Sequence, residues 1–156
     1  MMKISLTIIR AFFPSIVLMA NATSLFASDW GQLQGDAERS GNKPSEALSK
    51  NMGLLGSIAL TDGIYAAPVI GNGKVFVIDG SGVVFCIDAS TLEVIWRFET
   101  KGGLGNCNNV ATPAIFGDYL HVGTMAGHYY VLKCEDGALV KTLDCAEPIF
   151  SAIAVG

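Results

Sequence analysis

The sequence predicts an all-β protein built from stacked four-stranded antiparallel sheets, the blades of a β-propeller. Residues 67–98 align with residues 112–143 without a gap, so that Pro68 falls on Pro113, 45 residues later. A period of this length is typical of a propeller blade. Glycine and Asn/Asp-Gly pairs interrupt the repeats too often for helices. The inner strand segments are apolar on both faces, which requires a further sheet on each side.

Each repeat is expected to contain four short strands. In the first copy the pattern places them at 66–70, 74–79, 83–88 and 93–99, so that blade 1 covers about residues 66–99. Asn72-Gly73 between the first two segments suits a type I′ hairpin turn, because both residues tolerate positive φ. Blade 2 is expected at about 111–144, and a third copy begins at 149–156. The fold predicted is therefore a partial propeller of about two blades and the start of a third.

A polar and turn-rich segment precedes the repeats. Residues 28–60 are predicted to be an irregular lead-in, and residues 51–60 are the one part of it with the composition of a strand. The propeller repeats then occupy residues 61–156.

Residues 1–27 have the pattern of an export signal. Lys3 and Arg10 supply positive charge, residues 11–20 form a short apolar run, and small residues suited to cleavage follow. The run is short for a membrane span, so a cleaved signal peptide is favoured over an uncleaved anchor. We therefore expect a periplasmic or secreted protein without a stable membrane span after cleavage.

The charge balance argues against a nucleic-acid partner. The net charge is −4 and the ten basic residues are scattered through the chain, whereas binding to a phosphate backbone requires a basic face.

Four cysteines would meet an oxidising compartment after export. Cys86, Cys107, Cys134 and Cys145 allow three full pairings, among which the sequence does not choose. Cys86 occupies an apolar strand position, which predicts a buried side chain. Cys107 and Cys145 lie in comparable connections between repeats, so a bridge between them is one of the open pairings. The chain has no Cys-x-x-Cys, which leaves a zinc knuckle or a thioredoxin-like site unsupported.

Two groups of residues resemble ligand sites. His121 and His128 lie on either side of a hairpin and could face each other across it, but a metal site needs more ligands than two imidazoles. The glycine-rich residues 101–105 lack the following helix of a phosphate site, so a loop between blades is the better interpretation.

Two further features have structural interpretations. The turns that begin at Asp79 and Asp88 offer oxygens for calcium, but turn formation explains both. Trp96 is predicted to dock between blades, where a buried indole contributes a large apolar area. The sequence therefore predicts no catalytic, cofactor-binding or metal-binding residue.

The first repeat resembles the repeat of pyrroloquinoline-quinone-type (quinoprotein-like) β-propellers, among the WD40/YVTN-like repeats. Asp88, Thr91 and Trp96 match the closing Asp, the Thr and the docking Trp of that repeat, whereas Leu92 replaces its usual Gly. The second repeat retains Gly137 but has lost the Trp.

The lead-in shares this resemblance. Residues 30–41 are similar to the W-x-Q-x-x-G start of exported members. The resemblance covers most of residues 29–156.

This resemblance implies a closed ring of seven or eight blades, so the chain is expected to be a fragment of a longer protein or a truncated product. The favoured function is non-catalytic binding or scaffolding in the cell envelope, with protein partners at the propeller faces or at exposed blade edges.

One alternative is the N-terminal part of a quinone-dependent dehydrogenase, which would require PQQ and calcium. That class often has adjacent cysteines beside the cofactor, and this chain has none. The other alternative is a non-functional truncated gene product.

Overall fold

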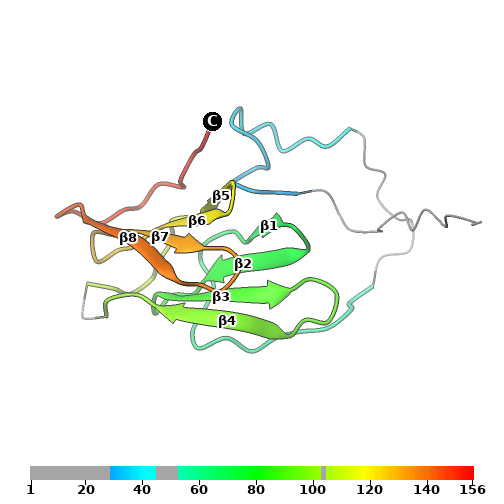
Figure 1. The fold of residues 1–156 in the computed structure, drawn as a ribbon, viewed down its shortest axis with the longest axis horizontal. Coiled ribbons are helices and arrows are strands. Elements are labelled where there is room, and N and C mark those ends of the chain that lie inside the picture. Colours follow the sequence, from blue (N-terminus) through cyan, green and yellow to red (C-terminus); the bar gives the residue numbers. More distant parts are fainter. Residues whose placement is uncertain (1–28, 45–52, 103–104) are drawn as a thin grey trace, which may run out of the picture.

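A computed structural model describes residues 29–44, 53–102 and 105–156. The predicted signal peptide, 1–27, lies outside these residues. The described chain forms two four-stranded antiparallel sheets, each a meander in chain order (Figure 1). It contains no helix, and no part of it is a helix long and apolar enough to cross a membrane. The all-β prediction is confirmed.

The two sheets are the two predicted blades. Blade 1 consists of β1 (Val69–Gly71), β2 (Lys74–Ile78), β3 (Val83–Asp88) and β4 (Val94–Glu99). Blade 2 consists of β5 (Ala114–Phe116), β6 (Tyr119–Gly123), β7 (His128–Lys133) and β8 (Leu139–Asp144).

Glycine and asparagine set the hairpin turns. Asn72 and Gly73 have φ of 51° and 71°, as a type I′ turn requires. Gly82 and Gly127, which are equivalent in the two repeats, have φ of 86° and 76° in the turns that follow β2 and β6. These turns place strands of the same blade in register and so determine which side chains share a face.

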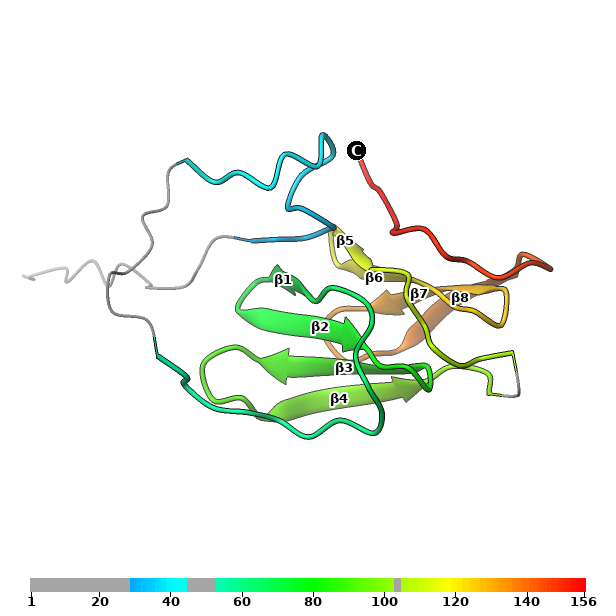
Figure 2. The ribbon, with the colours of Figure 1, turned by 180° about the vertical axis from the view of Figure 1, so that it is seen from behind.

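The core lies between the blades. Phe76, Ile78 and Val84 of blade 1 belong to one buried cluster with residues of blade 2, among them Val122 and Leu132. Figures 1 and 2 show the second sheet, yellow to orange, stacked beside the first. The apolar strands are therefore covered by sheet-on-sheet contact, as the two-sided apolar pattern predicts.

The opposite face of blade 1 is covered by the lead-in. Ile58 and Leu60 pack against Val77, Phe85 and Ile87, which form a second buried cluster. The strand expected over 51–60 is wrong for its described part, because residues 53–60 form none. This segment lies on the face of the blade instead of along a strand edge, where a ladder of backbone hydrogen bonds could form.

The start of the lead-in joins three parts of the chain. Trp30 exchanges backbone hydrogen bonds of 2.8 and 2.9 Å with Ile70, and the carbonyl of Gly31 accepts one of 2.7 Å from the first strand of blade 2. The Gln32 side chain then bonds both the N–H and the C=O of Val155, each at 3.2 Å. We call residues 29–32 the clasp, because they hold both inner strands and the last residues together.

The expected start of a third blade contains no strand. Residues 149–156 run along blade 2 instead. The N–H of Ile149 donates to the carbonyl of Thr124 at 3.0 Å, and the N–H of Ile153 donates to that of Thr112 at 3.1 Å. Whether this segment begins a third blade stays a prediction.

Candidate functional site

The outermost strands of the two blades form an apolar rim. Val94 and Ile95 of β4 are 46% and 44% exposed, and Leu139, Val140 and Leu143 of β8 are 44–51% exposed. We call these five residues the outer rim. Within the part of the chain that the structure describes, both strands have one unpaired edge, because each is last in its sheet. Exposed apolar side chains on an edge strand are suited to contact with another protein.

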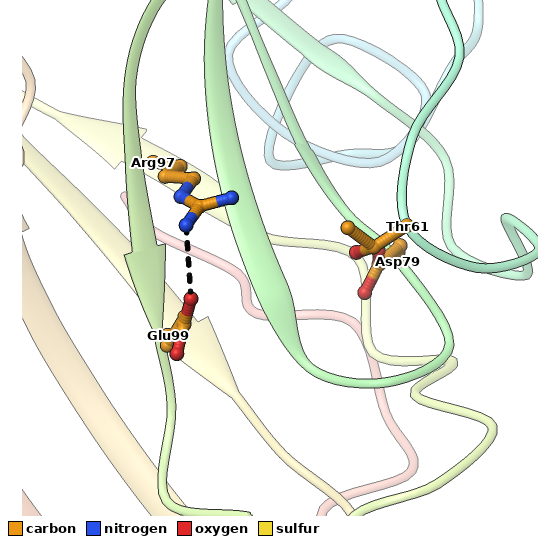
Figure 3. Close-up of polar contacts among 4 residues, drawn as sticks. All are labelled: Thr61, Asp79, Arg97 and Glu99. Carbon is orange, nitrogen blue, oxygen red and sulfur yellow. Dashed lines mark hydrogen bonds and ion pairs between the residues drawn. The ribbon is translucent and has the colours of Figure 1, made fainter.

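Charged residues interrupt the rim on blade 1. The guanidinium of Arg97 lies 3.4 Å from the Glu99 carboxylate, with both side chains exposed (Figure 3). An exposed pair of this kind contributes little to stability, so its main effect is on the charge that a partner meets.

Asp79 organises the turn that follows β2. Its buried carboxylate accepts hydrogen bonds from the Thr61 hydroxyl (Figure 3), from Ser81 Oγ at 2.9 Å and from the N–H of Val83 at 2.9 Å. Burial alone would raise the pKa of Asp79, but these hydrogen bonds outweigh it and hold the pKa below its ordinary 3.8. Asp79 therefore acts as an ionised turn residue that also fastens the lead-in to blade 1, and the turn interpretation is confirmed.

Two buried asparagines bond to turns, and the sequence pattern did not single them out. Asn109 connects the turns of the two blades, whereas among the described residues Asn106 bonds only to residues of blade 1. Asn109 donates to the carbonyl of Gly80 at 3.1 Å and accepts from the N–H of Met125 at 2.9 Å. Asn106 donates to Thr100 Oγ1 at 2.9 Å, and its buried Oδ1 has no partner among the described residues. Asparagine is common in exposed loops, so only burial reveals this role.

Trp96 docks between the blades, as predicted. Its indole N–H donates to the carbonyl of Cys134 at 3.2 Å, and its ring lies 5.8 Å from that of Phe76. Gly137 allows this approach, because a Cβ there would lie 2.7 Å from the Trp96 ring. The tryptophan of one blade thus closes on the glycine of the next.

The two histidines do not face each other, so that hypothesis is wrong. His121 pairs with Val131 across β6 and β7, and its Nδ1 shares a hydrogen bond of 2.8 Å with the Tyr129 hydroxyl. The ring of His128 instead contacts Tyr130. Because alternate strand residues point to opposite faces, the two imidazoles lie on opposite sides of blade 2. Burial lowers the pKa of His121.

The other two turn-like candidates lie in connections. Asp88 accepts hydrogen bonds from Ser90 Oγ at 2.6 Å and from the N–H groups of Ser90 and Thr91, and these bonds lower its pKa to about 2. The Asp88 turn is confirmed. In the glycine-rich segment 101–105, positions 103–104 lie outside the described residues. The N–H of Lys101 donates to the Tyr130 hydroxyl at 3.0 Å, as a connection between blades would.

The cysteines occupy two kinds of site. Cys86 is fully buried, which confirms its prediction, and Cys134 is half-buried beside the same core. Burial raises the pKa of both thiols to about 11. Cys107 and Cys145 are exposed, and their bridge stays a prediction.

Among the described residues, no group of three or more His, Cys, Asp or Glu side chains could hold a metal ion. The chemistry that the arrangement offers is therefore that of surfaces: an apolar rim, and turns fastened by a buried carboxylate and two buried amides.

Residues 30–137, more than half of the chain, match the profile of a family of PQQ-type repeats described as outer membrane protein assembly factor BamB. The chain belongs to this family. The match begins at Trp30 and includes both blades up to the turn that contains Gly137. No match was found among curated proteins.

Solved structures show the same architecture. The crystal structure of BamB from Moraxella catarrhalis is 27% identical with a TM-score of 0.51, over 55% of this chain and 26% of that chain. Quinohemoprotein alcohol dehydrogenase from Comamonas testosteroni is 22% identical with a TM-score of 0.59, over 76% and 20% of the two chains. A europium-containing methanol dehydrogenase is 12% identical with a TM-score of 0.69, over 82% and 26%.

These matches carry different weight. The two dehydrogenases show the fold alone, because their identity to this chain is low. This chain spans 20–26% of the length of the three structures.

Proposed function

We propose that this chain is an exported, non-catalytic binding protein of the cell envelope, which contacts proteins engaged in outer membrane protein assembly. The observation that carries the proposal is the match of residues 30–137 to the BamB family. The outer rim supports it, since exposed apolar residues on an unpaired strand edge offer a surface for another protein. Export rests on the signal pattern of residues 1–27.

A site-specific crosslink tests the partner. A photoreactive amino acid replaces Val140, which is 50% exposed near the start of β8, and the chain is expressed with its leader. We expect it to capture a protein of outer membrane assembly in the envelope fraction. Capture of no such protein would contradict the proposal.

A pair of matched variants locates the contact. Leu143→Glu places a charge on the rim of blade 2, and Ile95→Glu places one on the rim of blade 1; both positions are 44% exposed. If β8 is the contact, only Leu143→Glu abolishes the crosslink. Equal loss of the crosslink in both variants would assign the contact to the outer rim as a whole. An unchanged crosslink in both variants would exclude the outer rim as the contact.

A dehydrogenase function is the weaker candidate, because the described residues do not fit its cofactors. Among the described residues, no group of three or more His, Cys, Asp or Glu side chains could hold calcium, and the two partly or fully buried thiols, Cys86 and Cys134, belong to different blades. We propose that the chain works without PQQ or calcium. Thermal unfolding of the purified chain with PQQ and calcium added is the check, and we expect no shift of the unfolding midpoint. A saturable rise of the midpoint would overturn the proposal that the chain works without these cofactors.

A further inference from the structure

A cavity of about 420 Å³ lies between the two blades, apart from every residue of the outer rim. It is lined by residues of the turns that follow β1, β5 and β7, with Lys74 and Phe76 on blade 1 and Asp118, Lys133 and Glu135 on blade 2. This volume is within the range of small-molecule sites. Nothing in the binding function proposed above uses the cavity.

Hydrogen bonds hold the walls of this cavity in place. The Lys74 ammonium donates to the carbonyls of Cys134 at 3.2 Å and Glu135 at 3.5 Å. The N–H of Cys134 donates to the carbonyl of Asp118 at 2.9 Å, and its carbonyl also accepts from the Trp96 indole. The cavity is therefore formed before any ligand enters, which reduces the entropy cost of binding.

The lining carries equal numbers of opposite charges. Lys74 and Lys133 supply two ammonium groups, and Asp118 and Glu135 supply two carboxylates. A simple anion would meet the carboxylates and a simple cation would meet the ammonium groups, each at a cost. A ligand with both charges can pair with both kinds of side chain.

The cavity also has an apolar part. Tyr119, which is 41% exposed, and Ile115, which is half-buried against the core, both contribute to its wall. We propose that the cavity binds a small zwitterion of the α-amino-acid type with an apolar side chain. The ligand ammonium contacts the carboxylate of Glu135 or Asp118, and the ligand carboxylate contacts the Lys133 ammonium. The apolar side chain of the ligand lies against Ile115 and Tyr119.

Such a zwitterion has two sources, a free amino acid and a short peptide. The test titrates L-leucine and, separately, the dipeptide leucyl-leucine into the isotope-labelled full chain and follows backbone amide resonances by NMR. N-acetyl-leucine, which keeps only the negative charge, and leucinamide, which keeps only the positive charge, are the matched control ligands. We expect saturable shifts at Lys133 and Glu135 with at least one zwitterion and none with either control ligand. The zwitterion that binds with the lower Kd shows whether the ligand is a free amino acid or a short peptide.

Two charge-removing variants test the contacts. Lys133→Gln and Glu135→Gln change exposed side chains at the cavity, so folding is retained, and each is expected to weaken binding about fivefold, as loss of one solvent-accessible ion pair implies. Lys141→Gln, on exposed strand β8 outside the cavity, is the control and leaves binding unchanged.

The proposal is overturned if neither zwitterion produces saturable shifts at these positions. It is also overturned if leucinamide or N-acetyl-leucine binds as tightly as leucine, or if Lys133→Gln and Glu135→Gln bind like the Lys141→Gln control.

Discussion

At Gly137 the absence of a side chain determines how closely the two blades approach. The residue has φ of +72°, and an added Cβ would lie 2.7 Å from the Trp96 ring. Gly117 also has positive φ, +56°, but an added Cβ there would meet nothing within 4 Å. A substitution at Gly117 therefore measures backbone strain alone, whereas one at Gly137 measures backbone strain together with a steric clash between the blades.

We predict that Gly137→Ala destabilises the chain more than Gly117→Ala. Gly117→Ala costs about 1 kcal/mol, because an L-residue is strained at positive φ. Gly137→Ala costs about 1–3 kcal/mol more, because the methyl group must displace the indole from the seam between the blades. Urea unfolding followed by tryptophan fluorescence measures both, and equal losses would contradict the docking role of Gly137.

Leu92 shows that the backbone of the turn does not depend on the usual glycine. It stands where the PQQ-type repeat has Gly, and it still adopts φ of +62°, against +72° at the equivalent Gly137. The surrounding turn, in which the N–H of Leu92 donates to the carbonyl of Asp88 at 2.9 Å, holds it there.

Asp88 makes stability depend on pH. Its pKa is lowered from 3.8 to about 2 by hydrogen bonds, first from the Ser90 hydroxyl and then from backbone N–H groups. Because the folded state favours the charged form, this contribution is complete above pH 3.8 and is lost as the pH falls towards 2. We predict that Asp88→Asn reduces the loss of stability between pH 4 and pH 2, measured by thermal midpoints. An unchanged pH profile would assign acid sensitivity to other carboxylates.

At the scale of the element, residues 53–65 depend on contacts with a blade face. Ile58 and Leu60 cover the apolar residues Val77 and Phe85, and the Thr61 hydroxyl donates to buried Asp79. Leu54 and Leu55, by contrast, are 89% and 96% exposed. The segment is therefore attached at its C-terminal half, near Thr61.

We predict that Thr61→Val releases this segment. The substitution keeps the shape of the side chain but removes a hydrogen bond to a charged group, which costs about 2 kcal/mol. Ser81→Ala is the control, because Ser81 donates to the same carboxylate from within the turn. Limited proteolysis within 53–60 should accelerate in Thr61→Val and not in Ser81→Ala. Equal rates in the two variants would show that Ile58 and Leu60 suffice.

At the scale of the whole molecule, the clasp couples the blades at their inner edge. Trp30 bonds to β1, Gly31 bonds to β5, and Gln32 bonds to Val155. At the outer strands β4 and β8, the described residues show no added strand, although Trp96 of β4 docks on blade 2, and the free edges of both strands carry the rim. The inner side of the two blades is thus fastened within the chain, and the outer side offers unpaired backbone to another molecule.

We predict that Gln32→Ala loosens the end of the chain without unfolding the blades. The N–H of Val155 loses its acceptor, so its hydrogen exchange should accelerate about fivefold. Exchange in β2 and β3 should not change. Glu38→Ala, an exposed change in the same lead-in, is the control. No acceleration at Val155 would show that the Gln32 contact does not restrain this segment.

Local pattern was sufficient for much of this fold. The four strands of each blade, the turns, the burial of Cys86 and the docking of Trp96 follow from the repeat, from the apolar strand segments and from turn residues, and they are confirmed. The first strand is the exception in its bounds, because it begins at Val69 and not at residue 66. The composition of the lead-in does not reveal its packing, because residues 51–60 have the composition of a strand although Ile58 and Leu60 cover a blade face.

The sequence by itself determined the blade: its length, its four strands, its turns and its membership of a repeat family, because these depend on contacts between residues that are near in the chain. Only the tertiary structure decided what lies between and around the blades. The alternation of side chains along β6 and β7 puts His121 and His128 on opposite faces. Long-range hydrogen bonds place Gln32 beside Val155 and Asn109 between two turns. The stacking of the sheets brings charged residues of both blades around one cavity. The physical reason is that a repeat period specifies each sheet, whereas the stacking of sheets determines which distant side chains meet.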